Sequence, residues 1–159
     1  MVEVEKCKIP MEKLAKLVMF QLEETGRSNL IVTGNSMYPM LRSGVDMVEL
    51  IPLAKRQKKG DIILYRRDNG KYILHRIVAV TKDGYICCGD NQAEKEPVRQ
   101  DQLLAVVDGF ARKGKPYALT NPAYRIYAAF WTGTFPVRRQ VLAVGRYLFI
   151  LRQKTRRRK

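Results

Sequence analysis

The pattern of apolar and polar positions divides the chain into a helical start, a β-rich middle and a second helical region. Over residues 8–25 apolar side chains recur at i, i+3 and i+4 with Lys and Glu between them, and Gly26 follows, which predicts an amphipathic helix. Between about 29 and 119, short β-branched and aromatic runs are separated by Gly, Asp and Asn. These runs predict strands at 30–33, 45–51, 61–67, 71–80, 85–88 and 103–112.

The clearest turn in the middle region is Asn69-Gly70. Asn-Gly accepts positive φ at both central positions of a type I′ turn. The flanking runs 62–67 and 71–80 are therefore predicted to form a β-hairpin.

From about residue 121 the pattern becomes helical again. Apolar stretches at 124–131 and 137–151 are interrupted by arginines, and a proline stands near the start of each. The expected organisation is therefore an N-terminal helix (1–28), an antiparallel, mainly β domain (29–119) and a basic region of amphipathic helices (120–159).

The net charge of +15 is concentrated at one end of the chain. Residues 1–110 hold 17 Lys/Arg against 15 Asp/Glu, whereas residues 111–159 hold 13 Lys/Arg and no acidic residue. Helices that alternate apolar and basic residues lie in membrane interfaces and meet anionic lipid. We therefore expect peripheral attachment to an anionic membrane surface on the cytoplasmic side, unless the helices pack on the β domain and the end of the chain is a solvated tail.

The same basic residues would also bind nucleic-acid phosphates. The sequence lacks the aromatic and basic surface motifs of the known RNA-binding modules, so no specific nucleic-acid partner is expected.

Several classes of protein are disfavoured by what the sequence lacks. The start of the chain does not show the basic-then-apolar order of a secretory signal. The longest charge-free run of the basic region, 126–137, is well short of the roughly 20 residues that span a bilayer. Cys7, Cys87 and Cys88 form no spaced framework and are expected to be thiols in a reducing compartment. With one histidine and no Cys-x-x-Cys pair, no metal or other cofactor is expected.

A candidate nucleophile follows the first predicted strand in Gly34-Asn35-Ser36-Met37-Tyr38-Pro39. A serine hydroxyl needs a base to take its proton and donors to stabilise the oxyanion. Gly34 would let the backbone approach a substrate closely, and Pro39 would fix the chain after the serine. The alternative is an ordinary turn serine.

The candidate base is His75, the only histidine in the chain. Its reference pKa of about 6.5 suits proton transfer near neutrality. A third candidate is Asp90 in Gly89-Asp90-Asn91, because a carboxylate can hold an imidazole in the required tautomer. Taken singly, a packed histidine and a turn aspartate explain these two residues equally well.

Taken together and in order, the serine segment, Lys59-Gly60-Asp61, His75-Arg76 and Gly89-Asp90-Asn91 resemble the motifs of type I signal peptidases. The resemblance covers about residues 29–112 and is closest to the branch of archaeal, endoplasmic-reticulum and sporulation enzymes, which use a histidine base. It implies the antiparallel β-fold shared with self-cleaving SOS repressors. The 35 residues before the serine are too few for the helix-turn-helix domain of such repressors.

The resemblance implies a role for each matching residue. Ser36 would be the acylated nucleophile and His75 its general base. Asp90 would orient His75, with Asp101 in reserve and Glu94 and Glu96 nearby.

Gly34, Asn35, Met37 and Pro39 would line the oxyanion and substrate site around Ser36. Gly34 stands where some relatives carry a hydroxyl that assists the oxyanion. Lys71 is an alternative base that does not match the family's motif.

The implied activity is cleavage of a signal- or leader-like peptide or preprotein, bound as an added β-strand, after small residues. The alternative is an inactive relative that binds peptides as an adaptor at a membrane.

Overall fold

The computed structural model describes residues 11–112, 114–133, 137, 140, 142–144 and 147. Its named elements are α1 (Met11–Thr25), β1 (Ser28–Ile31), β2 (Met47–Ile51), β3 (Ile62–Arg66), β4 (Tyr72–Val80), β5 (Gly84–Cys88), β6 (Glu96–Arg99), a 3₁₀ turn (Gln100–Gln102), β7 (Leu103–Arg112), β8 (Lys115–Ala118) and α2 (Pro122–Gly133).

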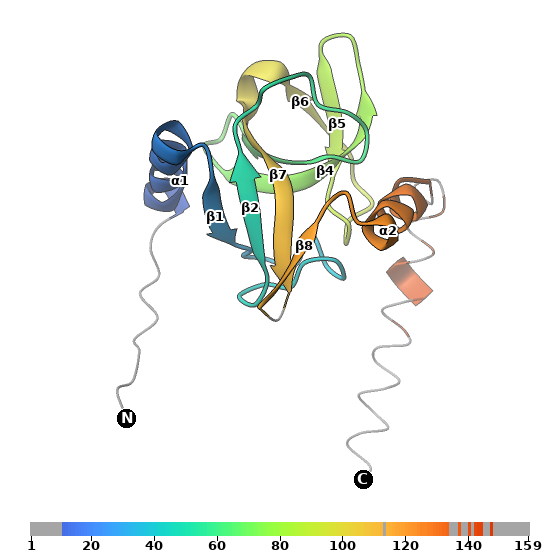
Figure 1. The fold of residues 1–159 in the computed structure, drawn as a ribbon. Coiled ribbons are helices and arrows are strands. Elements are labelled where there is room, and N and C mark those ends of the chain that lie inside the picture. The colour runs from blue at the N-terminus through green and yellow to red at the C-terminus, as the bar shows by residue number, and fades with distance from the viewer. Residues whose placement is uncertain are drawn as a thin grey trace.

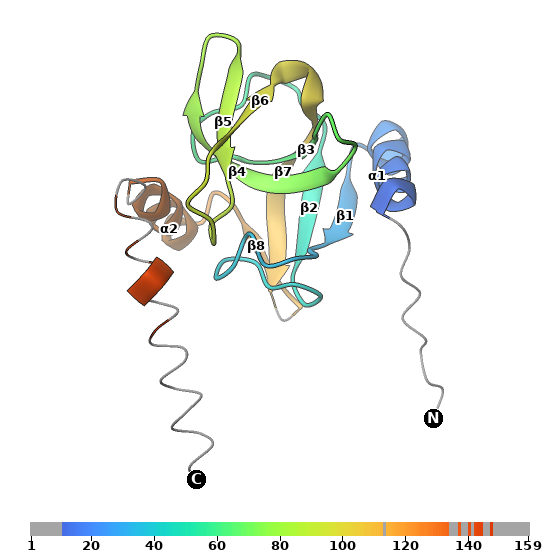
Figure 2. The same cartoon turned by 180° about the vertical axis from the view of Figure 1, so that it is seen from behind.

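The strands form one curled antiparallel sheet in the order β1-β2-β7-β3-β4-β5-β6, with β8 pairing β7. β4 crosses behind the upright strands β2 and β7, α1 lies beside β1, and α2 lies on the opposite side of the sheet (Figure 1). The view from behind shows the same curl with β4 in front (Figure 2). The predicted fold class, mainly antiparallel β with helices at both ends, is confirmed.

β3 lies between two hydrophobic clusters because both of its faces are buried. Ile62 and Leu64 pack with the buried face of α1 and with β1, β2 and part of β7. Ile63 and Tyr65 pack on the other side with residues of β4, β5, β6 and β7. Alternation along a strand thus divides the side chains of β3 between two cores.

The predicted hairpin is confirmed, with Ile62 opposite Arg76 and Arg66 opposite Tyr72. Its turn differs from the predicted type I′ turn. The N–H of Gly70 donates to the carbonyl of Arg67, and Gly70 has a φ of 81°, so the tight turn spans 67–70. The Arg67 N–H also donates to the Lys71 carbonyl, so three residues separate these hydrogen-bonded ends, with glycine in the left-handed position that such loops require.

Two strands were not predicted individually, and one prediction falls largely outside the described residues. β6 contains a proline and two charged residues, and β8 is short and exposed throughout. Neither strand has the β-branched, alternating pattern that predicts a strand. The predicted stretch 124–131 lies within α2, whereas most of 137–151 and residues 8–10 are not described. In the part of the chain that the model describes, no helix has both the length and the hydropathy needed to cross a membrane.

Candidate active site

The segment that carries Ser36 is anchored in the core by the residues that follow the serine. Met37, Met40 and Leu41 are buried against the cluster that includes α1 and β2. Ser36 is half-buried and Tyr38 is exposed. Buried and exposed residues therefore alternate closely here, and the serine lies at the surface of a well-packed turn.

The Gly89-Asp90-Asn91 segment supports Ser36 directly. The backbone N–H of Asn91 donates to the Ser36 carbonyl at 2.7 Å, and Asn91 Nδ2 donates to the Asn35 carbonyl at 3.2 Å. A Cβ placed on Gly89 would lie 2.7 Å from the Ser36 carbonyl oxygen and 3.0 Å from Ser36 Cβ. Position 89 therefore requires glycine because the serine segment fills the space where a side chain would be.

The pairing of β4 with β5 relates His75 to the same glycine. Arg76 lies opposite Cys88, the last residue of β5, and Gly89 is the next residue along the chain. The serine segment therefore packs against the chain directly after β5, the strand that pairs with the His75-bearing strand β4.

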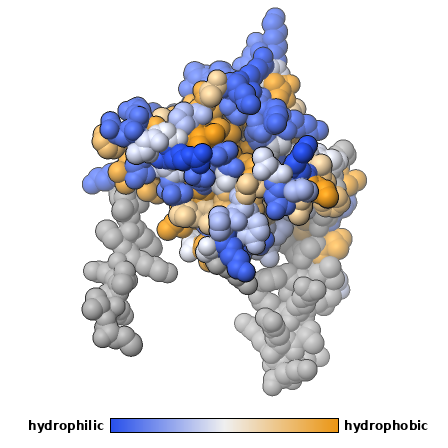
Figure 3. Space-filling model, in the orientation of Figure 1, coloured by the Kyte–Doolittle hydropathy of each residue, from blue (hydrophilic) through white to orange (hydrophobic). Residues whose placement is uncertain are grey.

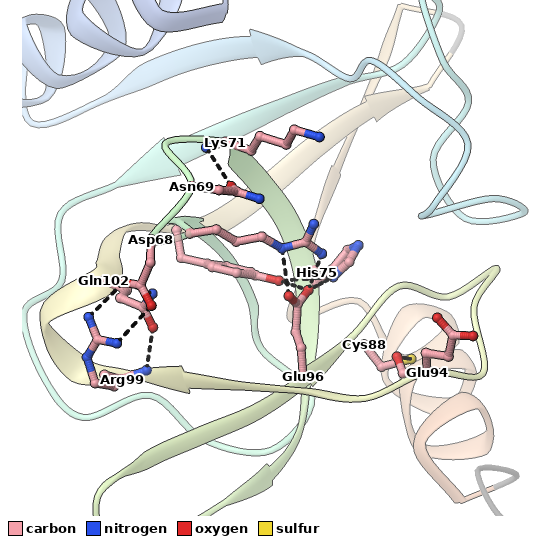
Figure 4. Close-up of polar contacts among 11 residues, drawn as sticks. Asp68, Asn69, Lys71, His75, Cys88, Glu94, Glu96, Arg99 and Gln102 are labelled. Atoms are coloured by element: carbon pink, nitrogen blue, oxygen red, sulfur yellow. Dashed lines mark hydrogen bonds and ion pairs between the residues drawn. The ribbon is translucent and has the colours of Figure 1, made fainter.

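His75 is held by groups from two other strands, β3 and β6. Its Nδ1 lies 2.9 Å from Glu96 Oε1 and 3.1 Å from the Tyr65 hydroxyl oxygen. The Tyr65 hydroxyl also donates a short hydrogen bond to Glu96. Figure 4 shows Glu96 reaching from β6 to His75 on β4. The imidazole is 2% exposed, so these contacts are shielded from bulk water.

The charges around this contact determine its protonation. Burial raises the pKa of Glu96, but hydrogen bonds from Arg67 and Tyr65 outweigh it and hold that pKa below its usual value. Burial is the largest effect on His75 and lowers its pKa, although Glu96 raises it in part. A neutral imidazole beside an ionised carboxylate donates from Nδ1, which leaves Nε2 with a lone pair. That nitrogen is the one that can accept a proton.

Asp90, expected to orient His75, binds Arg76 instead. Arg76 Nε and Nη2 donate to the two Asp90 oxygens at 2.9 and 2.7 Å, and both side chains are fully buried. The Tyr127 hydroxyl donates to Asp90 Oδ2 at 3.2 Å, and Trp131 Nε1 donates to the Asp90 carbonyl at 2.8 Å. Because His75 and Arg76 are adjacent on β4, their side chains point to opposite faces. Asp90 therefore faces Arg76, and Glu96 is the carboxylate bound to His75.

The other candidate residues have separate surroundings. Asp101, the reserve carboxylate, is exposed and pairs with Arg99. Lys71, the alternative base, lies at the hairpin turn with its side chain directed away from the His75–Glu96 contact (Figure 4).

Around Ser36, the Gly34 N–H donates to Ser43 Oγ and the Pro39 carbonyl accepts from Arg112. Met37, expected near substrate, has its side chain in the core.

Sequence reasoning named Glu96 as a nearby carboxylate but missed its contact with His75, together with the parts played by Tyr65 and Arg67. The missing step was the recognition of β6. In a strand, Glu96 and Val98 share a face, and Val98 is apolar. This alternation was the available signal that Glu96 points inward. Within the described ranges, no group of three His, Cys, Asp or Glu residues could hold a metal ion.

Comparison with known proteins gives a partial match. Signal peptidase I W of Bacillus subtilis (strain 168) is 34% identical to this chain over 86 residues, which cover 50% of this chain and 45% of that protein. The chain therefore spans about half the length of this curated relative. No family model matches the sequence. The likeness and the antiparallel sheet are compatible with a signal-peptidase-like fold and support a peptidase at the level of the family.

The Arg76–Asp90 pair generates a prediction about stability. Asp90→Asn leaves a buried guanidinium without its counter-charge and should lower the free energy of unfolding by about 3–5 kcal/mol. Urea denaturation of the two proteins measures the difference. Asp68→Asn is the control because its pair with Arg99 is exposed, and it should leave the free energy of unfolding little changed. Equal stability of the two variants would contradict a structural role for the buried pair.

The contact of Gly89 with Ser36 generates a second prediction. Gly89→Ala pushes a methyl group against backbone and should cost about 1–3 kcal/mol, with chemical-shift changes concentrated at Ser36 and Asn91. Thermal unfolding and amide NMR spectra measure these effects. Gly133→Ala is the control, because a Cβ there meets no atom within 4 Å. Unchanged Ser36 and Asn91 resonances in Gly89→Ala would show that the contact is looser than described.

Proposed function

We propose that this chain is a serine endopeptidase in which Ser36 is the nucleophile, His75 the general base and Glu96 the carboxylate that orients the base. The observation that carries the proposal is the partly buried hydrogen bond from His75 Nδ1 to Glu96, because it leaves Nε2 as the proton acceptor. The support of Ser36 by Gly89 and Asn91, which directly follow the strand paired with β4, favours the same assignment. The likeness to signal peptidase I W agrees with it.

The reaction follows from these positions. Ser36 Oγ attacks the carbonyl carbon of the scissile peptide bond while its proton passes to His75 Nε2. The oxyanion of the tetrahedral intermediate is stabilised by backbone donors, which include the Ser36 N–H. The C–N bond then breaks, and His75 returns the proton to the leaving amine. Water then gives a proton to His75 and attacks the acyl-Ser36 ester. The bond from Ser36 Oγ to the acyl carbon breaks, His75 returns the proton to Oγ, and the acid is released.

The proposed substrate class is an extended peptide with small residues before the cleaved bond, such as a signal- or leader-like segment. The name of the matched relative supports this class. An extended peptide can add its backbone hydrogen bonds to the edge of a sheet, which suits an antiparallel fold.

An acylation experiment tests the proposal. Intact mass spectrometry after incubation with a serine-reactive acylating probe should show a single adduct on the wild-type protein. Ser36→Ala and His75→Ala should abolish it, because the first removes the nucleophile and the second its base. Glu96→Gln should slow acylation by about 10²-fold or more, since the orienting carboxylate contributes on that scale.

Asp101→Asn is the matched carboxylate control and should acylate at the wild-type rate, because Asp101 is exposed and pairs with Arg99. Circular dichroism confirms folding of each variant. An adduct that persists without His75, or none on the wild-type protein, would overturn the peptidase proposal in favour of a peptide-binding adaptor.

A specific observation also favours a place for this activity at a membrane surface. On α2, Ile126 is 72% and Phe130 57% exposed, whereas Tyr127 and Trp131 of the same helix face Asp90. Hydrophobic surface is visible over α2 at the right of Figure 3. Beyond α2, Val144 and Tyr147 are also exposed. We propose that this face and the basic residues after it bind an anionic bilayer, at about 1 kcal/mol per Lys or Arg near the surface.

Vesicle co-sedimentation tests the attachment. The full chain should sediment with vesicles containing phosphatidylserine or phosphatidylglycerol, less so at high salt, and weakly with phosphatidylcholine alone. Removal of residues 134–159, or Ile126→Ser with Phe130→Ser, should reduce sedimentation at least several-fold.

The truncation keeps residues up to Gly133 because removal of α2 would also remove its contacts with Asp90. Leu17→Ser with Phe20→Ser on α1 is the control, because it removes similar exposed apolar surface from another helix. Equal sedimentation of all variants would exclude this surface as the attachment site.

A further inference from the structure

The strand that carries Glu96 does not pair directly with the strand that carries His75. β6 is the last strand of the sheet order and pairs with β5. In that pairing Glu96 lies opposite Cys87, so β5 separates it from β4 in the sheet. The side chain of Glu96 must therefore be directed to His75 by side-chain contacts.

Two arginine–carboxylate pairs join β6 to the β3–β4 turn, and we name them together the turn clamp. Arg67 Nε and Nη2 donate to the two Glu96 oxygens at 2.7 and 2.8 Å. In the reverse direction, Arg99 Nη1 and Nη2 donate to the two Asp68 oxygens at 3.2 and 3.0 Å. Two-pronged pairs of this kind fix the orientation of both partners.

The two halves of the clamp differ in their surroundings. The Arg99–Asp68 pair is largely exposed and is a weak contact on general grounds. The Arg67–Glu96 pair is partly buried and shares its carboxylate with His75 and Tyr65. Both Glu96 oxygens thus accept hydrogen bonds from Arg67. Oε1 also contacts His75 Nδ1 and the Tyr65 hydroxyl.

We propose that Arg67 is a positioning residue for this site: it holds Glu96 against His75 Nδ1 and so maintains the tautomer with an unprotonated Nε2. Its effect on turnover rests on the proposed function, whereas its effect on the tautomer does not. Arg67 touches neither Ser36 nor a peptide in this role, and it acts through Glu96.

The titratable and charged groups around His75 allow the direction of the pH effect to be worked out. Tyr65 on β3, Arg67 in the turn, Cys87 on β5 and Glu96 on β6 lie on its side of the sheet, and Asp90, which faces Arg76, acts on it from the other side. Burial raises the pKa of Cys87 to about 12 and raises that of Tyr65, so both stay neutral near pH 7. Asp90 and Glu96 raise the pKa of His75, and Arg67 lowers it. Loss of Arg67 should therefore raise the pKa of His75, and acid should inhibit the enzyme at a higher pH.

Because His75 is the single histidine, ¹⁵N NMR of the full chain observes one imidazole without assignment. The wild-type protein at pH 7.5 should show protonated Nδ1 and unprotonated Nε2. Arg67→Gln should give a mixture of tautomers and a titration midpoint shifted to higher pH. In the acylation assay it should lose about tenfold in rate at pH 6 and less at pH 8.

Arg67→Lys separates position from charge, because lysine keeps the charge but lacks the two-pronged geometry. It should keep a midpoint near that of the wild-type protein and still show mixed tautomers. Arg66→Gln is the matched control, because it removes the same charge one residue away. The Arg66 side chain lies over the Tyr72 ring. It should leave the His75 spectrum unchanged.

A wild-type-like tautomer and titration in Arg67→Gln would overturn the inference, and so would equal changes in Arg66→Gln. Wild-type tautomer in Arg67→Lys would reduce the role of Arg67 to charge alone and would overturn the positioning. If no protein acylates but the NMR changes occur, the peptidase proposal fails and the positioning of His75 by Arg67 stands.

Discussion

Arg76 and Asp90 form a fully buried ion pair in which both carboxylate oxygens accept from one guanidinium. Other parts of the chain also meet at this pair. Arg76 Nη2 also reaches Met40 Sδ of the serine segment, and Nη1 donates to the Tyr124 hydroxyl of α2. A buried charge pair is costly to separate, so it imposes the relative positions of these parts. The peptide between Gly89 and Asn91, which supports Ser36, is placed by the same constraint.

Strand β4 carries a structural residue and a chemical residue at adjacent positions. Arg76 points to one face and joins the ion pair, whereas His75 points to the other and meets Glu96 and Tyr65. The carboxylates of Asp90 and Glu96 therefore have different roles, although the two residues are close in the sequence. Asp90 balances a permanent cation, and Glu96 serves a base whose charge changes. Closeness in the sequence to His75 does not show which carboxylate contacts it. The alternation of side chains along β4 does, because it directs His75 and Arg76 to opposite faces.

Much of the fold could be predicted because its signals are local. The helix before Gly26 and the hairpin of β3 and β4 follow from side-chain periodicity and turn residues. β6 was missed because Glu96, Pro97 and Arg99 disfavour a strand by composition. The contact of Asp90 with Arg76 was not foreseen for a related reason, since it depends on which face of β4 each carboxylate meets. Such non-local pairings depend on sheet register, and the sequence contains no local signal for that register around Glu96.

Trp131 is the only tryptophan in the chain, and its indole N–H donates to the carbonyl of Asp90. The residue before Asp90 is the glycine on which Ser36 rests. Tryptophan fluorescence of the unlabelled protein therefore arises from one indole, and its environment would change if α2 left the ion pair. The molecule thus contains its own optical reporter for the connection between the C-terminal helix and the serine segment, and this reporter is independent of any substrate.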